Sequence, residues 1–152
     1  MRHILVQEAA FSVDAEHERL KSAGLDIGAI VMFTGSVRDI NEDDNVSNLH
    51  LEHYPGMTEK AIDTILDEAA ARWQVLAATV IHRVGDLTPG EDIVLVGIAS
   101  MHRADAFHAC EFVMDYLKTR ATFWKKERTA GGERWLTTRD SDLAAARDWE
   151  ER

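Results

Sequence analysis

Basic side chains gather between Tyr116 and Arg128, and they are the residues of this sequence best suited to chemistry. The cations there are Lys118, Arg120, Lys125, Lys126 and Arg128, and the only acid among them is Glu127. The whole chain has 152 residues and a formal net charge of -10 at pH 7. A local excess of positive charge within an acidic chain indicates a binding site for an anion.

Lys118 and Lys125 form the pair whose spacing favours catalysis. The apolar pattern predicts a helix from about Arg103 to Thr119, which puts Lys118 in the last turn. If a strand begins at Thr122, Lys125 can fold back towards the helix end while Lys126 points away. Two ammonium groups held close together lower each other's pKa, as burial does. A lysine altered in this way can act as a general acid, base or nucleophile near neutral pH.

A simpler alternative gives these lysines no chemical role. A lysine near a helix C-terminus complements the helix dipole, and a lysine on a strand can face water. The residue types alone leave both interpretations open.

Other cations follow predicted strands. Arg38 comes just after Gly35, and His102 and Arg103 come after a strand that ends at Ser100. The start of the following helix favours an anion, which Arg103 could bind with two hydrogen bonds. Together with the lysines, these residues predict a phosphate-sized anion site. Alternatively, Arg38 only balances neighbouring acids and His102 only begins the helix.

The histidines predict no metal site, and the lone cysteine predicts no reactive thiol. His50 and His53 are three residues apart on a predicted strand and so point to opposite faces. His102 and His108 lie almost on opposite sides of a helix. Cys110 falls among apolar helix positions, as a small core residue would, and a single cysteine suits a reducing compartment.

The elements that must position these residues indicate a single α+β domain over residues 1–152. Strands are expected at His3–Gln7, Ile27–Thr34, Asn48–Tyr54, Leu76–Val84 and Ile93–Ser100, with a terminal hairpin of Phe123–Thr129 and Arg134–Thr138. Helices are expected at about Asp14–Ser22, Thr58–Trp73 and Arg103–Thr119. The last of these helices is expected to bury Ala106, Phe107, Cys110, Val113, Met114 and Leu117.

Four local features are more specific. The continuous apolar run Ile27–Thr34 predicts a strand buried on both faces, and the polar segment Ser36–Ser47 predicts a mobile surface loop. Thr58 is expected to cap its helix. The acidic tail from about Asp140 is helix-prone and expected to fray.

Composition narrows the function. The acidic balance argues against a general nucleic-acid binder, which needs a basic footprint. No apolar run is long enough to span a membrane, and the N-terminal run is too short for a signal peptide. We therefore expect a cytoplasmic protein with no membrane partner.

Five segments together resemble one known family. They are FTGSVRD (Phe33–Asp39), LEHYPGMTEKA (Leu51–Ala61), VIHRVGDLTPGE (Val80–Glu91), the pair His102-Arg103, and MDYLKTRATFWKKE (Met114–Glu127). In this order and spacing they resemble the large, catalytic subunit of molybdopterin synthase, the MoaE family. The resemblance extends from about Phe11 to Trp149, which makes it far more specific than any single motif.

The resemblance implies a sulfur-transfer enzyme of molybdenum cofactor biosynthesis. Such proteins convert cyclic pyranopterin monophosphate (precursor Z) into the dithiolene molybdopterin. The sulfur comes from a small ubiquitin-like partner whose C-terminal Gly-Gly ends in a thiocarboxylate and enters a pocket of the large subunit. The family assembles as a central dimer of large subunits within a heterotetramer, and its fold is an α/β hammerhead with an added antiparallel sheet. No metal or other cofactor of the protein itself is implied.

The resemblance also implies roles for individual residues. Lys118 matches the central catalytic lysine, and Lys125 lies beside it. Binding of the pterin phosphate or of the partner's tail is implied for both lysines and for Ser36, Val37, Arg38, His102, Arg103, Lys126, Glu127 and Arg139. Ser36 departs from relatives with lysine, which removes one possible phosphate contact. Thr122 departs from relatives with proline, which predicts a less rigid break after Arg120.

Two alternative functions remain open. The chain could be a docking scaffold for a ubiquitin-like tail without catalysis of its own. From charge and chemistry alone, it could also be a module that binds a small phosphorylated metabolite. The presence of both Lys118 and Lys125 favours the enzyme.

Overall fold

The first sheet holds the strands that the sequence predicts to be buried. A computed structural model describes all residues from Met1 to Arg152. The strands lie in the order β1 (Arg2–Gln7), β5 (Ala77–Arg83), β7 (Asp92–Ser100) and β2 (Ala29–Ser36). β1 runs parallel to β5, and the other neighbours are antiparallel. β5 and β7 are central, which is why their β-branched and apolar residues are almost all buried.

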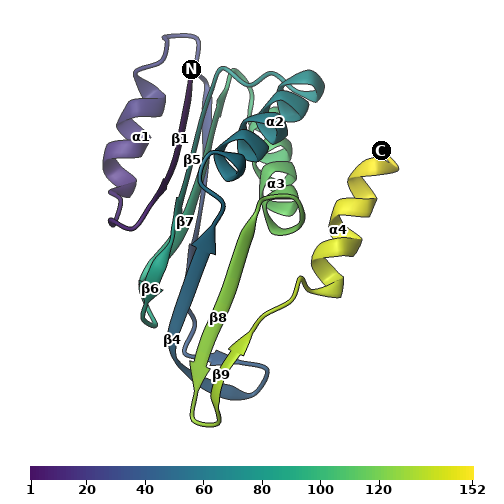
Figure 1. Ribbon diagram of the computed structural model, residues 1–152. Coiled ribbons are helices and arrows are strands. Elements are labelled where there is room, and N and C mark those ends of the chain that lie inside the picture. Colours follow the sequence, from purple (N-terminus) through teal and green to yellow (C-terminus); the bar gives the residue numbers. More distant parts are fainter.

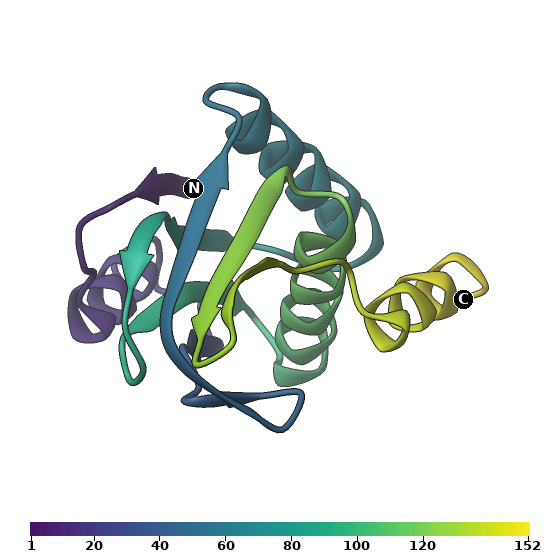
Figure 2. The same ribbon diagram turned by 60° about the horizontal axis from the view of Figure 1, so that its bottom comes forward.

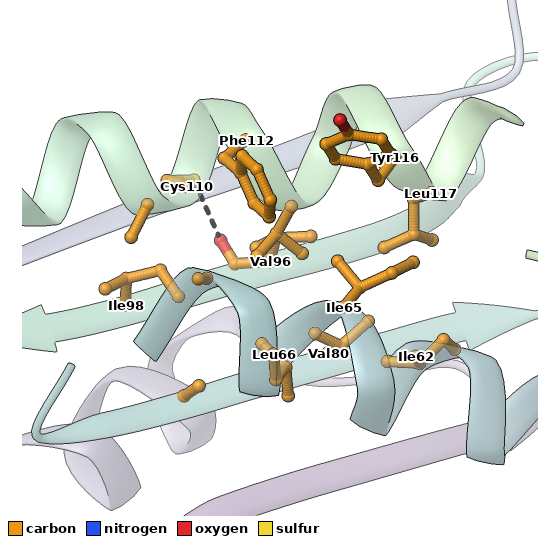
Figure 3. Packing of buried hydrophobic residues seen from close by; sticks show 14 of the residues in the cluster. Ile62, Ile65, Leu66, Val80, Val96, Ile98, Cys110, Phe112, Tyr116 and Leu117 are labelled. Atoms are coloured by element: carbon orange, nitrogen blue, oxygen red, sulfur yellow. Dashed lines mark hydrogen bonds between the residues drawn. The ribbon is translucent and has the colours of Figure 1, made fainter. Parts of the chain in front are cut away.

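Helices cover both faces of this sheet (Figure 1). α2 (Met57–Arg72) and α3 (Arg103–Thr119) lie on one face, and α1 (Val13–Lys21) lies on the other. Figure 3 shows the main core between them, where Val80, Val96 and Ile98 of the sheet meet apolar residues of α2 and α3. Because successive strand residues alternate in direction, Ala77 and Ala99 pack on the opposite side, against Leu20 of α1.

A second, antiparallel sheet crosses the end of the first (Figure 2). Its strands lie in the order β3 (Ile40–Asn41), β4 (Asp44–His53), β8 (Phe123–Thr129) and β9 (Gly132–Trp135), and β6 (Gly85–Leu87) also pairs with β4. A small core forms where Leu49 and Leu51 of β4 meet Val37, Val84 and Leu87. The predicted α+β class with an additional antiparallel sheet is confirmed.

Two predictions about the N-terminal half are wrong. β2 is not buried on both faces, because it is an edge strand that pairs only with β7, and its Phe33 is 40% exposed. Residues 36–47 are not a loop throughout, because β3 and β4 form a hairpin there. Glu42 and Asp43 make its turn with φ of 52° and 64°, as a two-residue hairpin requires. Charge stabilises this hairpin instead of apolar burial, since Arg134 of β9 pairs with Asp44 at 2.8 Å.

Thr58 does not cap α2, contrary to the sequence prediction. The N-cap is Gly56, whose N–H donates to the Glu59 carboxylate at 3.0 Å. Thr58 is fully buried instead, and its hydroxyl donates to the Thr122 carbonyl at 2.9 Å. The hydroxyl also accepts from the Tyr54 N–H at 3.1 Å. This contact ties the start of α2 to the short link between α3 and β8.

α3 has the predicted bounds and buries most of the predicted stripe, with Ala106, Cys110, Val113 and Leu117 inside, but its large aromatic contacts differ from the prediction. Phe107 is 59% exposed, whereas Phe112 and Tyr116 are buried. Cys110 is buried as predicted, and its thiol contacts the Val96 carbonyl (Figure 3). Burial raises the pKa of Cys110 to about 11, which keeps the thiol protonated and unreactive.

The acidic tail does not fray, because it forms α4 (Asp140–Glu150) and docks on α3. Trp149 is 2% exposed and packs edge-on against Trp73 and Phe112. Its indole N–H donates to Asp115 at 2.6 Å, and its carbonyl accepts from Arg72 at 3.0 Å. This docking cannot be predicted from the sequence pattern, because one large aromatic residue, Trp149, makes most of these contacts. None of the four helices is long and apolar enough to cross a membrane.

Candidate active site

A pocket of about 590 Å³ opens where the two sheets meet. Its walls come from β2, the ends of β5 and β7, β4, β8 and the last turns of α3. The segment 136–139 and the first turn of α4 complete it. The site therefore joins residues that lie far apart in the sequence.

Both predicted catalytic lysines line this pocket. Lys118 lies in the last turn of α3, where the Arg120 N–H donates to the Tyr116 carbonyl at 2.7 Å and ends the helix. Only residues 120–122 separate this helix end from β8, which carries Lys125. The Thr122 carbonyl is held by the buried Thr58 hydroxyl, so the break without proline has its own anchor.

The pocket alters the acid–base chemistry of Lys125. Burial and then the nearby charge of Lys118 lower the pKa of Lys125 to about 7. Lys125 can therefore exchange a proton near neutral pH, as the sequence predicts for a close lysine pair. The alternative in which Lys125 simply faces water is wrong, because its side chain is largely buried in the pocket wall.

His82 is a pocket residue that sequence reasoning missed. It lies near the end of β5, is 5% exposed, and stacks on Phe123 with ring centroids 3.8 Å apart. Burial, followed by the charges of Lys125 and Lys118, lowers the pKa of His82 to about 3. The available signal was its place in the inward series of β5 with Val80, where a polar residue is unexpected.

Glu127 also lines the pocket, but its carboxylate is already bound within the chain. It is 3% exposed and accepts hydrogen bonds from Arg134 at 2.6 Å and from the Asn41 amide at 3.1 Å. The Asn41 oxygen in turn accepts from Arg139 at 2.9 Å. Glu127 thus holds its neighbours in place, and through Asn41 it is linked to a predicted ligand-binding arginine.

The three predicted residues at the end of β2 differ in where their side chains lie. Arg38 is exposed, lines the pocket and forms no ion pair with the nearby acids of the chain. Ser36 lines the pocket too, and its hydroxyl donates to Asp92 at 2.9 Å. Val37 is buried and contributes backbone, since its N–H donates to the Glu91 carbonyl at 2.9 Å. The guanidinium of Arg38 is therefore the group available to an anion.

His102, Arg103 and Lys126 lie outside the pocket. His102 and Arg103 begin α3 and Lys118 ends it, which separates them by roughly 22 Å along the helix. Lys126 lies on the other face of β8, over the Trp135 ring and 3.3 Å from Glu133. The predicted anion site that combines Lys118 with His102 and Arg103 is therefore not assembled within one chain. Their roles in ligand binding stay predictions.

The pocket thus has the groups of an acid–base site for an anionic ligand, with two lysines, Arg38 and Arg139 around one cavity. The MoaE protein family model matches residues 6–120, so the chain belongs to this family.

Relatives agree over nearly the full length. The chain is 57% identical over 148 residues to a molybdopterin synthase catalytic subunit from Pseudomonas aeruginosa, covering 97% of this chain and 99% of that one. The structure of a molybdopterin biosynthesis MoaE protein from Burkholderia ambifaria superimposes with a TM-score of 0.85, at 48% identity and 99% coverage of both chains. A molybdopterin synthase structure from Staphylococcus aureus gives a TM-score of 0.80 at 30% identity, covering 89% of this chain and 96% of that one.

Proposed function

We propose that this chain is the catalytic subunit of a molybdopterin synthase. It transfers sulfur from the C-terminal thiocarboxylate of a small ubiquitin-like partner to cyclic pyranopterin monophosphate, and so forms the dithiolene of molybdopterin. The observation that carries the proposal is the Lys118–Lys125 pair in one pocket, with a Lys125 pKa lowered to about 7. The names of the relatives support the same activity.

The charges of the pocket suit both anions of this reaction. Arg38 and Arg139 line its wall and can bind phosphate or carboxylate oxygens with two hydrogen bonds. Lys118 adds a third cation from the helix end. An extended diglycine tail has no side chains, so it can enter a narrow pocket that already holds a pterin.

The chemistry needs positioning and proton transfer more than activation, because a thiocarboxylate is already a nucleophile. Its sulfur attacks a side-chain carbon of the pterin, and the carbon–oxygen bond at that carbon breaks, so that the oxygen substituent leaves with a proton. An acyl–sulfur link between the pterin and the partner remains. Water then cleaves the acyl–sulfur bond, so that the tail keeps a carboxylate and the pterin keeps the sulfur. Lys118 transfers protons in both steps, and Lys125 lies beside it to stabilise developing negative charge.

The same proposal includes a central dimer of this chain within a heterotetramer. The dimer would explain the predicted roles of His102 and Arg103. Within one chain these residues lie at the far end of α3 from Lys118 and cannot reach the same pocket. In the dimer, these two residues serve the pocket of the second copy. We also place the reaction in the cytoplasm, which the single, buried and protonated cysteine supports.

Lys118→Ala tests the catalytic assignment. We expect the variant to form no dithiolene in single-turnover mixing with thiocarboxylated partner and pterin substrate, while it still binds the partner. Arg128→Ala is the matched control, because Arg128 is a cation of β8 that lies outside the pocket and pairs with Glu133 at 2.8 Å. Near-normal turnover by Lys118→Ala would contradict the proposal and favour a docking scaffold.

A further inference from the structure

Asn41 of β3 lines the pocket, and the proposed mechanism gives it no role. Its side chain lies between a buried acid of β8 and an arginine that follows β9. The amide nitrogen donates to both carboxylate oxygens of Glu127 at 3.1 Å, and the amide oxygen accepts from Arg139 at 2.9 Å. Both ends of one short amide are therefore bound at the pocket wall.

The neighbours of Asn41 allow its amide only one orientation. The carboxylate of Glu127 accepts hydrogen bonds, so the amide nitrogen faces it and the amide oxygen faces Arg139. Glu127 is held in turn by Arg134, whose Nε donates to it at 2.6 Å. Arg134 also donates to the main-chain carbonyl of Asn41 at 3.1 Å. Asn41 is thus fixed through its main chain and its side chain by residues other than Arg139.

Arg139, in contrast, depends on Asn41 for its position. It is exposed and lies just before α4, in the link that follows β9. Its guanidinium forms no ion pair within the chain, and the hydrogen bond to Asn41 is the only one it makes. A long side chain without such a partner occupies many rotamers, and a ligand has to restrict them when it binds.

The amide of Asn41 is neutral, so it holds Arg139 without neutralising it. A carboxylate in its place would compete with an anionic ligand for the guanidinium. Burial and the charge of Lys118 are the main causes of the lowered pKa of Lys125, and the charge of Arg139 adds to them. The held guanidinium therefore acts on the part of the pocket that contains the lysine pair.

We propose that Asn41 is a positioning residue, which holds the guanidinium of Arg139 in the pocket for an oxyanion of the ligand. That oxyanion is the phosphate of the pterin or the carboxylate end of the partner's tail. The inference rests on the proposed function for these two ligands, whereas the contact between Asn41 and Arg139 can be measured without them. Glu127 contributes indirectly, because it orients the amide that meets Arg139.

A double-mutant cycle tests whether Asn41 acts through Arg139. Calorimetry measures the Kd of cyclic pyranopterin monophosphate in one arm, and of a synthetic peptide that ends in Gly-Gly in the other. For one of these ligands we expect Asn41→Ala to raise the Kd by about tenfold, as loss of a hydrogen bond to a charged group does. Arg139→Ala should raise it at least as much, and the double variant no further than Arg139→Ala alone.

The arm that responds identifies the oxyanion that Arg139 binds. Losses that add up in the double variant would overturn the inference, as would an unchanged Kd of both ligands for Asn41→Ala. Asn48→Ala is the matched control, because Asn48 lies outside the pocket and its amide donates to Asp86 at 3.3 Å. Its Kd values should equal those of the unchanged protein. Thermal unfolding of every variant shows whether the loss is confined to the pocket.

NMR of the arginine side chains tests the contact in the protein without ligand. We expect Asn41→Ala to lose the slowly exchanging N–H signal of Arg139, and Asn48→Ala to keep it. Asn41→Asp is a second variant of the same size, which should keep this signal and still bind the anion more weakly. Equal Arg139 signals in Asn41→Ala and the unchanged protein would contradict the inference. Failure of the unchanged protein to transfer sulfur would contradict the proposed function alone.

Discussion

The surroundings of Lys125 in the fold disfavour the charged form of its side chain. Its neighbours are the apolar pocket wall and Lys118, and burial is the larger cause of its lowered pKa. A group of this kind reduces stability in exchange for reactivity near neutral pH. The fold tolerates the charge because the lysine lies at a pocket wall where ligand and solvent enter.

Lys125→Met should therefore stabilise the protein, and more so at low pH. The pKa of Lys125 is about 7 in the folded chain against an ordinary value of 10.5, so between these values the unfolded chain binds more protons. The free energy of unfolding contributed by this lysine thus rises as pH rises from 7 to 10.5. We expect a gain on the order of a few kcal/mol at pH 6.5 for Lys125→Met, and a smaller gain at pH 9.5.

Urea unfolding at the two pH values measures this difference. Lys126→Met is the matched control, because Lys126 lies partly exposed on the other face of the same strand and pairs with Glu133. A gain for Lys125→Met that does not depend on pH would show that packing, and not charge, is the cause.

At the scale of elements, the type and order of the helices and strands can be predicted from the sequence better than their burial and their neighbours. Apolar periodicity locates β5, β7, α2 and α3, because each buries one continuous set of aliphatic residues. It fails for β2, whose edge position depends on which strands pair, and for the β3–β4 hairpin, which Arg134 stabilises from a distant strand. The docking of α4 also depends on tertiary contacts.

The candidate site shows the same division. The lysine pair follows from local rules, since a helix end, a short link and strand alternation bring Lys118 and Lys125 together. The places of His82 and of the Asn41 link between Glu127 and Arg139 cannot be predicted from local rules, because they depend on how the two sheets cross. The family resemblance adds residue roles that no local rule contains.

Trp149→Ala tests whether α4 is an integral element. The indole is 2% exposed and contacts Trp73 and Phe112, so its loss should cost about 3–5 kcal/mol in the free energy of unfolding, or release the helix. Leu143→Ala is the control on the same helix, since Leu143 is 40% exposed.

Equilibrium unfolding and amide hydrogen exchange of residues 140–150 provide the readouts. Faster exchange confined to α4 in Trp149→Ala would show local undocking, whereas a lower midpoint throughout would show global destabilisation. Equal effects of the tryptophan and leucine substitutions would argue against docking through Trp149.

At the scale of the whole molecule, the net charge of -10 contrasts with a pocket that gathers two lysines and three arginines. Cations placed where anionic ligands enter favour their capture, while the acidic remainder keeps other anions away. His102 and Arg103 are outside this arrangement in a single chain, and the proposed dimer gives them their function.

Mixed dimers test this composite site. We expect Arg103→Ala and Lys118→Ala each to be nearly inactive alone, and their random mixture to recover about a quarter of normal turnover, because each mixed dimer keeps one intact pocket. The mixture is prepared by co-expression with two affinity tags and assayed for dithiolene formation. No recovery would place Arg103 in the function of its own chain, and full activity of Arg103→Ala alone would remove it from the site.

The ion pair between the buried Glu127 and the partly exposed Arg134 has a further consequence, for strand pairing. The sequence of β8 carries lysine at both 125 and 126, so a slip of β8 by one residue against β4 would still present a lysine to the pocket. The same slip would also turn Arg128 inward in place of Glu127, against the guanidinium of Arg134. Arg128 would then lie beside Arg134 in the buried position of Glu127, and although Arg134 also pairs with Asp44, this arrangement is far less stable than the native ion pair. Glu127 thus helps to decide which of the two adjacent lysines faces the pocket.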